Sequence, residues 1–157
     1  MLLQKLADYN CWANACVLKR LEVITANDTP LPERALHLFS HVLNAQWIWI
    51  ARITGTKSPV KVFQYHELPA LRSLHEATCP KLAELVRTAG EAELTRLIAY
   101  TNTQGKAYET PVGDILTHCF NHATYHRGQV AIAIRAESLE PVNTDYITWV
   151  RELMGQE

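Results

Sequence analysis

The residues with the clearest chemical potential lie in the segment 118–129, HCFNHATYHRGQ, where His118, His122 and His126 are spaced four residues apart. If the segment is helical, with about 100° of rotation per residue, the three imidazoles lie on one stripe of the helix. An imidazole on an apolar face costs about 1 to 3 kcal/mol unless its nitrogens find partners. A metal ion would be such a partner, so the spacing indicates a metal site.

Helix geometry limits which of these histidines can share one ion. The outer pair, His118 and His126, would be separated by about 12 Å along the helix axis, at 1.5 Å per residue. A single ion can therefore take His118 with His122, or His122 with His126, because residues four apart lie one above the other. The third ligand must come from elsewhere, and the second spaced pair, His37 and His41, offers it.

The donor set has a chemical consequence. Three neutral imidazoles on a divalent ion leave coordination positions for water or substrate, which is typical of a catalytic rather than a closed structural site. Zinc and nickel are the natural occupants. Such an ion can lower the pKa of a bound water to about 7, or hold a thiolate, and either product is a nucleophile at neutral pH.

Hydrophobic periodicity predicts the elements that position these residues. We expect an all-α protein, an up-and-down four-helix bundle with a small β-hairpin inserted between the third and fourth helices and a short C-terminal helix. No linker or repeat divides the chain, so 1–157 is expected to be one domain. The predicted helices are 3–23, 32–53, 67–89, 111–136 and 144–154, and the predicted strands are 94–100 and 106–109.

Single residues mark the expected helix ends and breaks. Gly55 is expected to end the second helix, and Pro80 to kink or break the third. Thr110 is expected to cap the fourth helix, with Pro111 in its first turn. Asn10 falls on the core stripe of the first helix, where a hydrogen bond to a neighbouring helix is the expected reason for it.

Composition excludes several classes of function. The 157 residues are 48% hydrophobic, and 15 Lys and Arg balance 16 Asp and Glu, so a nucleic-acid partner is not expected. The four cysteines form no CxxC pair and no regular framework, which argues against a disulfide scaffold and favours a reducing cytosol. Neither a signal peptide nor an apolar run of membrane-spanning length is visible. We therefore expect a cytoplasmic protein that does not bind membranes.

Three parts of the sequence together carry a family resemblance. Residues 9–14 (YNCWAN) resemble a YNxWAN opening, His41 is followed by Trp47 and Trp49, and residues 121–129 (NHATYHRGQ) are similar to an NHxxxHRGQ signature. The later segment 141–145 also fits. The chain thus resembles, from about residue 3 to 150, the DinB-like (DinB/YfiT) family of metal-binding four-helix bundles.

The resemblance implies a choice among the histidines. It makes His41, His122 and His126 the metal ligands, with His118 and His37 as neighbours one turn away. It also implies an enzyme that acts on a small molecule, by thiol transfer or isomerisation with a low-molecular-weight thiol. A metal-dependent hydrolase and a non-catalytic stress-response module remain the alternatives, and a homodimer is the expected assembly.

Other residues near the histidine stripe have weaker functional interpretations. Gln129 could orient a ligand ring, since metal-bound imidazoles usually donate their other N–H. Arg52 could receive a carboxylate of substrate or thiol, or simply be solvated near a helix end. Tyr125 could supply a hydroxyl or pack. Arg127 is expected to form a structural ion pair or an interface, and Cys119 to be a small buried hydrophobe. No general base is evident, so the catalytic residues stay unassigned.

Overall fold

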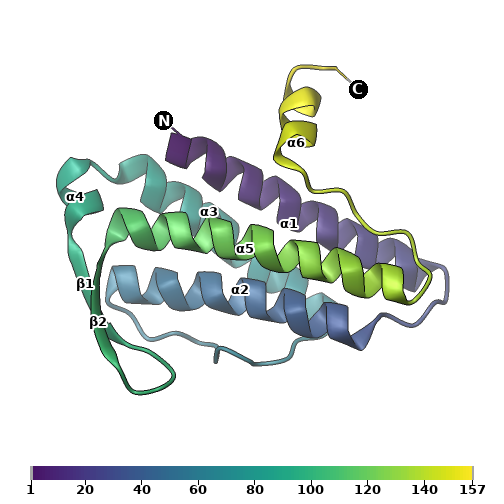
Figure 1. Ribbon diagram of the computed structural model, residues 1–157, viewed down its shortest axis with the longest axis horizontal. Helices are drawn as coiled ribbons and strands as arrows, with labels where there is room; N and C mark the ends of the chain where they lie inside the picture. Colours follow the sequence, from purple (N-terminus) through teal and green to yellow (C-terminus); the bar gives the residue numbers. More distant parts are fainter. Residues whose placement is uncertain (1, 157) are drawn as a thin grey trace.

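The computed structural model describes residues 2–156 and is built around four long helices (Figure 1). The predicted all-α bundle, the hairpin and the short C-terminal helix are all confirmed. The sequence periodicity placed the ends of the four helices to within a few residues, because each has an apolar stripe that faces the others. The four are α1 Leu2–Ala26, α2 Glu33–Thr54, α3 Leu68–Thr88 and α5 Val112–Ala136.

The direction of α3 departs from a simple up-and-down alternation. The connection 55–67 returns along α2 rather than turning at its end, since His66 bonds through its backbone to Ser40 in the first half of α2. Further along, Lys81 of α3 lies over the ring of Trp47 on α2. The helices α2 and α3 therefore run parallel, and Figure 1 shows the long connection following the edge of α2. Such crossovers are a known variant of the four-helix bundle.

Two expected helix breaks have different outcomes. Gly55 has φ 67° and its N–H bonds the carbonyls of Ala51 and Arg52, so it ends α2 in the left-handed conformation that glycine adopts readily. Pro80 does not break α3, which is continuous from Leu68 to Thr88. Proline within a helix removes one hydrogen bond, and here the packing of α3 on α1 and α2 outweighs that loss.

The hairpin packs at the end of the bundle and differs in detail from the prediction. A short helix α4 (Glu91–Thr95) takes up the start of the expected first strand, and β1 (Leu97–Thr101) then pairs antiparallel with β2 (Ala107–Pro111). The predicted cap at Thr110 is wrong. Thr110 lies in β2 with its hydroxyl 3.2 Å from that of Tyr100, because strand pairing extends to Pro111, which occupies the N-cap position.

A buried polar cluster ties α1, α2 and α5 together. Arg127, 1% exposed, donates to the side-chain oxygens of Asn10 (2.9 Å) and Asn14 (3.0 Å) on α1. Gln46 of α2 donates to Asn10 at 3.2 Å, which confirms the interhelical bond expected there. Of the two expectations for Arg127, the structural ion pair is wrong, since among residues 2–156 no carboxylate bonds its guanidinium. We name Arg127, Asn10, Asn14 and Gln46 the arginine cluster.

The C-terminal helix covers one side of this cluster. Helix α6 (Tyr146–Leu153) lies outside the four-helix arrangement, at the upper right of Figure 1. It is held by aromatic packing, with the ring of Tyr9 5.2 Å from Tyr146 and 6.0 Å from Trp149. The guanidinium of Arg127 in turn lies 5.2 Å from the centre of the Tyr9 ring. This contact links α6 to the arginine cluster.

The cysteines depart from the sequence-based prediction. Cys11 of α1 and Cys79 of α3 form a disulfide across 68 residues of chain, whereas Cys16 and Cys119 are free. One bond is not a disulfide scaffold, but the expectation that the cysteines remain thiols is wrong for this pair. Sequence spacing could not reveal the pair, because only helix packing brings the two residues together. Separately, within 2–156 none of the helices has the length and apolar character of a membrane span.

Candidate metal centre

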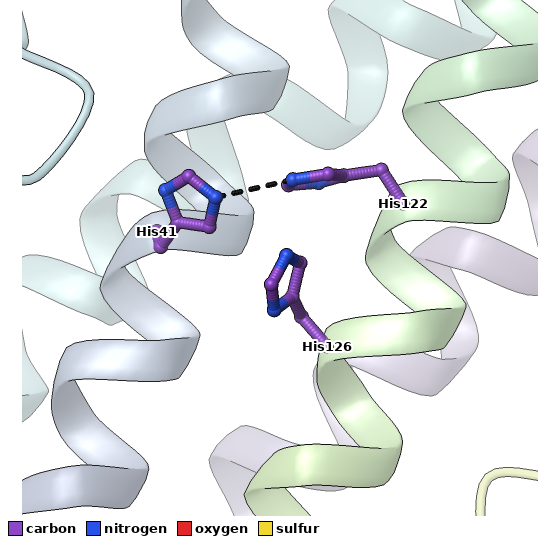
Figure 2. Close-up of side chains that lie close together, drawn as sticks. All are labelled: His41, His122 and His126. Carbon is purple, nitrogen blue, oxygen red and sulfur yellow. Dashed lines mark hydrogen bonds between the residues drawn. The ribbon is translucent and has the colours of Figure 1, made fainter.

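Three histidines meet between α2 and α5. His41 projects from α2, and His122 and His126 project from successive turns of α5 (Figure 2). Each residue offers one ring nitrogen, and these atoms all lie within 4.8 Å of one another. The two helices are antiparallel neighbours, so a pair spaced by four on one helix can face a single residue on the other.

The spacing of the nitrogens suits a common metal ion. Nε2 of His41 lies 3.1 Å from Nε2 of His122. Two nitrogens bound at about 2.0 to 2.1 Å with a tetrahedral angle would lie about 3.3 Å apart. The pair therefore needs only a slight adjustment to hold zinc or a similar ion between them.

Hydrogen bonds on the far side of two rings leave the correct nitrogens free. Nδ1 of His41 lies 3.2 Å from the Val62 carbonyl, and Nδ1 of His126 lies 2.8 Å from Oε1 of Gln129. Because these oxygens can only accept, both Nδ1 atoms carry the proton and donate. Each Nε2 is then unprotonated and directed toward the third histidine, which is the state a metal ligand requires.

The surroundings of the rings also favour the neutral form. Burial, and to a smaller extent the nearby rings of His126, His41 and His118, together lower the pKa of His122 to about 3. Burial likewise lowers the pKa of His126, although its hydrogen bond to Gln129 opposes this. Desolvation disfavours the charged imidazolium. His122 and His126 are therefore neutral at neutral pH, which is the form of histidine that binds a metal ion.

The cluster is accessible from outside. All three histidines are only partly buried, and within residues 2–156 no fourth His, Cys, Asp or Glu joins the group. Phe63, in the 55–67 connection, stacks on the His41 ring at 5.3 Å and 12° while remaining 78% exposed. A three-nitrogen centre at an exposed edge leaves room for a further ligand, which is the arrangement found in catalytic metal sites.

The two competing histidines lie outside the group. His118 is one turn before His122, with ring centres 5.4 Å apart, and its other neighbour is Trp49 at 5.7 Å. His37 is directed toward Glu33, 3.4 Å away, at the exposed surface. The geometry thus brings together the trio implied by the family resemblance and none of the other three combinations.

A pocket lies next to the histidine group and is lined by residues of α2, the hairpin and α5, with none of the three histidines among them. It has a volume of about 310 Å³, and His118 forms the wall nearest His122. Arg52 stacks beside it, with its guanidinium 4.4 Å from the Trp49 ring and 4.6 Å from the Tyr100 ring. It also donates to the Thr101 carbonyl at 3.2 Å, so it joins the hairpin to α2 instead of lying free in solvent. The lining residues are Trp49, Tyr100, Thr110, Asp114, Ile115 and His118.

The remaining candidates differ in position. Gln129 bonds His126, as the orienting interpretation requires, and stays a candidate for that role. Tyr125 is 66% exposed, with its ring 5.1 Å from that of His126, so its hydroxyl could reach a ligand only at the rim. Cys119 is buried in the core, as expected, and its burial raises the pKa of the thiol.

Sequence reasoning missed the connection 55–67 as part of the centre. The acceptor for His41 is a backbone carbonyl, that of Val62, and a backbone atom leaves no signal in residue type. The side chains that hold this connection, Asn44 and Ser40, flank His41 on α2. Their polar character at buried positions was the available signal, because a buried amide or hydroxyl normally has a hydrogen-bond partner.

Comparison with known proteins finds relatives of the chain over most of its length. The model of the DinB family matches residues 1–153. The chain is 27% identical over 154 residues to Protein DinB of Bacillus subtilis (strain 168), covering 90% of each. It is also 23% identical over 137 residues to the uncharacterized protein YizA of the same organism, covering 87% of this chain and 85% of that one. This chain belongs to the DinB family.

Proposed function

We propose that the protein binds one divalent metal ion through His41, His122 and His126 and uses it to catalyse a reaction of a small molecule. The observation that carries the proposal is the convergence of three ring nitrogens within 4.8 Å at a partly exposed edge. Histidines with only a structural role would each bond separate partners in the core. Here two of them direct an unprotonated Nε2 toward the same point.

The pocket beside the centre supports a small-molecule substrate. A volume of about 310 Å³ is at the lower end of the range for ligand pockets, which suits a compact molecule. Its walls combine the flat rings of Trp49 and Tyr100 with the polar groups of Asp114 and His118. Arg52, whose guanidinium packs against both aromatic rings, would add positive charge that could attract a carboxylate of the substrate.

We propose zinc or nickel as the ion, because three imidazole nitrogens suit both metals. When bound, the ion would supply a Lewis acid that lowers the pKa of a water or thiol held beside it. The chain's own residues would orient the ligand rings and bind the substrate in the pocket. The proposed reaction is thiol transfer or isomerisation with a low-molecular-weight thiol as co-substrate.

Metal analysis followed by a turnover screen tests this function. The purified protein is stripped with a chelator, reloaded separately with zinc and nickel, and assayed against small electrophiles with and without several thiols. We expect one ion per chain and turnover that requires both metal and thiol. Turnover with water alone would assign a hydrolase instead. A loaded protein that is inactive under all conditions would support a binding module.

Assembly and location are separate proposals. We propose a homodimer, supported by the large apolar side chains of Tyr125 and Ile132, 66% and 69% exposed on α5. We also propose a cytoplasmic location. In a reducing cytoplasm Cys11 and Cys79 would be kept as thiols, so their disulfide does not support this location. Light scattering and thiol alkylation of protein taken directly from cells would test the two proposals.

A further inference from the structure

We propose that Asn44 is a positioning residue of the metal centre, acting through the connection 55–67 to orient His41. The inference rests on the proposed metal site, and it assigns a role to a residue that touches neither metal nor substrate. Asn44 would fix the place of the Val62 carbonyl, and this carbonyl would fix the ring of His41.

The first step is the bond between the connection and the ligand. The Val62 carbonyl accepts from Nδ1 of His41 at 3.2 Å. This bond determines which nitrogen of His41 is unprotonated, and it sets the rotation of the ring about its bond to the backbone. On the opposite side, Nε2 of His41 meets Nε2 of His122 at 3.1 Å. If the carbonyl were displaced, neither the tautomer of His41 nor the orientation of its ring would be fixed.

The second step is how the carbonyl is held in place. The connection contains neither helix nor strand from residue 55 to 67, so it has no regular backbone pairing of its own. The side-chain amide of Asn44, which is 0% exposed, donates to the carbonyl of Gln64 at 2.7 Å and lies 3.5 Å from that of Val62. One amide group thus holds the two carbonyls that flank Phe63, the residue stacked on His41.

The third step is a second attachment further along the connection. Oδ1 of Asn44 accepts from Nε2 of His66 at 2.8 Å, and His66 is largely buried. The hydroxyl of Ser40 accepts from the His66 backbone N–H at 3.0 Å and lies 3.4 Å from its carbonyl. Both heavy atoms of the Asn44 amide are therefore used, and both contact the connection.

The register on α2 explains why this attachment would transmit orientation. Ser40 precedes His41, and Asn44 follows it by three residues, so one turn of a rigid helix carries the ligand and both attachments. The distance from the helix to the Val62 carbonyl is then set by short side chains of few rotatable bonds. This resembles the other side of the centre, where Gln129 bonds His126 from the next turn of α5.

Affinity for the metal alone is the first test. Loss of a group that orients a metal ligand commonly weakens binding by about 10- to 100-fold. We expect Asn44→Ala and Asn44→Asp to raise the Kd for zinc by about this factor in competition with a chromophoric chelator. Asn44→Asp keeps the size and the acceptor for His66 but loses the donor to the two carbonyls. If Asn44 acted through packing alone, the Kd of Asn44→Asp for zinc would equal that of the wild type.

Gln46→Ala is the matched control. Gln46 is a buried amide on the same helix, but it faces α1 and bonds Asn10 and Asn14. Its loss should lower the free energy of unfolding without changing the Kd for zinc. Ser40→Ala removes the second attachment alone and should weaken zinc binding less than Asn44→Ala. If Asn44→Ala does not fold, Asn44→Asp and Ser40→Ala carry the test.

Nitrogen NMR of the histidine rings reports the tautomer of His41, and this measurement does not depend on the free energy of unfolding. In the wild type we expect His41 as a single Nδ1–H tautomer, and in Asn44→Asp a mixture of tautomers. Unchanged zinc affinity and an unchanged His41 signal in the Asn44 variants would overturn the inference. If wild-type protein itself bound no zinc, the proposed function would fail with it. Tight wild-type binding with unaltered variants would reject the role of Asn44 alone.

Discussion

Two polar clusters lie on different sides of α5 and include the adjacent residues His126 and Arg127. His126 belongs to the partly exposed histidine group, whose nitrogens point at one another. Arg127 belongs to the arginine cluster, which is almost fully buried. Its guanidinium donates to Asn10, Asn14 and the hydroxyl of Thr124, with distances of 2.9 to 3.0 Å. The same sequence signature, 121–129, therefore serves two different purposes.

The contrast between the clusters lies in how completely their polar atoms are used. In the arginine cluster most donors meet acceptors within the protein, although the Nε of Arg127 and the amide nitrogen of Asn10 have no partner among the described residues. In the histidine group the far sides of the His41 and His126 rings are bonded, and ring nitrogens of all three histidines converge on the near side, where Nε2 of His122 lies 3.1 Å from Nε2 of His41. Polar groups bonded to each other hold helices together, whereas converging lone pairs can hold a ligand.

The arginine cluster also shows why a strong signature residue need not be catalytic. Burial lowers the pKa of Arg127 below its usual value, yet an arginine remains charged at neutral pH. Its charge faces amide oxygens and the Tyr9 ring instead of a carboxylate. These contacts join α5 to α1, and Tyr9 in turn contacts α6. We interpret Arg127 as a structural residue that holds α5 against α1.

The largest expected effect is on zinc affinity, which should depend on the histidine group and not on the arginine cluster. His122→Ala removes one of the three ligands, and we expect the Kd for zinc to rise by at least about 1,000-fold, or about 4 kcal/mol. Replacing Arg127 with Ala should change the same Kd less than about threefold, because the arginine bonds no ligand ring. Chelator competition at a temperature well below unfolding measures both.

His118→Ala is the control for this prediction. His118 lies next to His122 and lines the pocket, but its nitrogens do not enter the group of three. We expect His118→Ala to retain zinc and, if the proposed pocket is used, to change the KM for substrate. Loss of zinc in His118→Ala with retention in His126→Ala would show that the ligand set is wrong.

The second effect is on folding stability, which we expect to depend mainly on the arginine cluster, whereas zinc binding depends on the histidine group. Arg127→Ala leaves a cavity in the core and removes donors from Asn10 and Asn14, which we expect to lower the free energy of unfolding by about 3 kcal/mol. Urea denaturation in the presence of a chelator measures this without the contribution of metal. Arg135→Ala, at an exposed position on the same helix, should change stability by less than about 0.5 kcal/mol. Equal stability of the two variants would contradict the structural role of Arg127.

Local sequence patterns correctly predicted structural features that depend on residues close together in the chain. The i, i+4 spacing placed His122 and His126 on one face of a helix, and Gly55 marked the end of α2, because both features arise within a few turns. The bond of Asn10 to another helix followed from its polar type at a core position. The choice of His41 came from the family resemblance, since bare spacing left His37 equally suitable.

Features that depend on long-range packing were not predictable in this way. The direction of α3 is set by contacts of 55–67 with the side of α2, and nothing in the periodicity of α3 records it. The same crossover brings Val62 to His41. Cys11 and Cys79 meet only because α1 and α3 pack together. At Pro111 two local signals competed, and strand pairing with Leu97 prevailed over the helix cap expected at Thr110.

The smallest expected effect is on the pH dependence of stability without metal, and it distinguishes the clusters once more. Burial lowers the pKa of His122 to about 3 in the folded protein, whereas an unfolded histidine titrates near about 6.5. Below about pH 6.5 the unfolded chain takes up a proton that the folded chain does not, so stability falls as pH is lowered from about 6.5 toward about 3. Arg127 stays charged in both states over this range and adds nothing to the slope.

We therefore expect urea denaturation in chelator to show a smaller loss of stability between pH 7.5 and pH 5 for His122→Ala than for the wild type. Arg127→Ala should be less stable at both values but should lose the same amount between them as the wild type. A slope that disappeared with Arg127 and persisted without His122 would reverse the assignment. The acid sensitivity would then belong to the packing of α5 on α1, and the neutral state of the histidines would have another cause than burial.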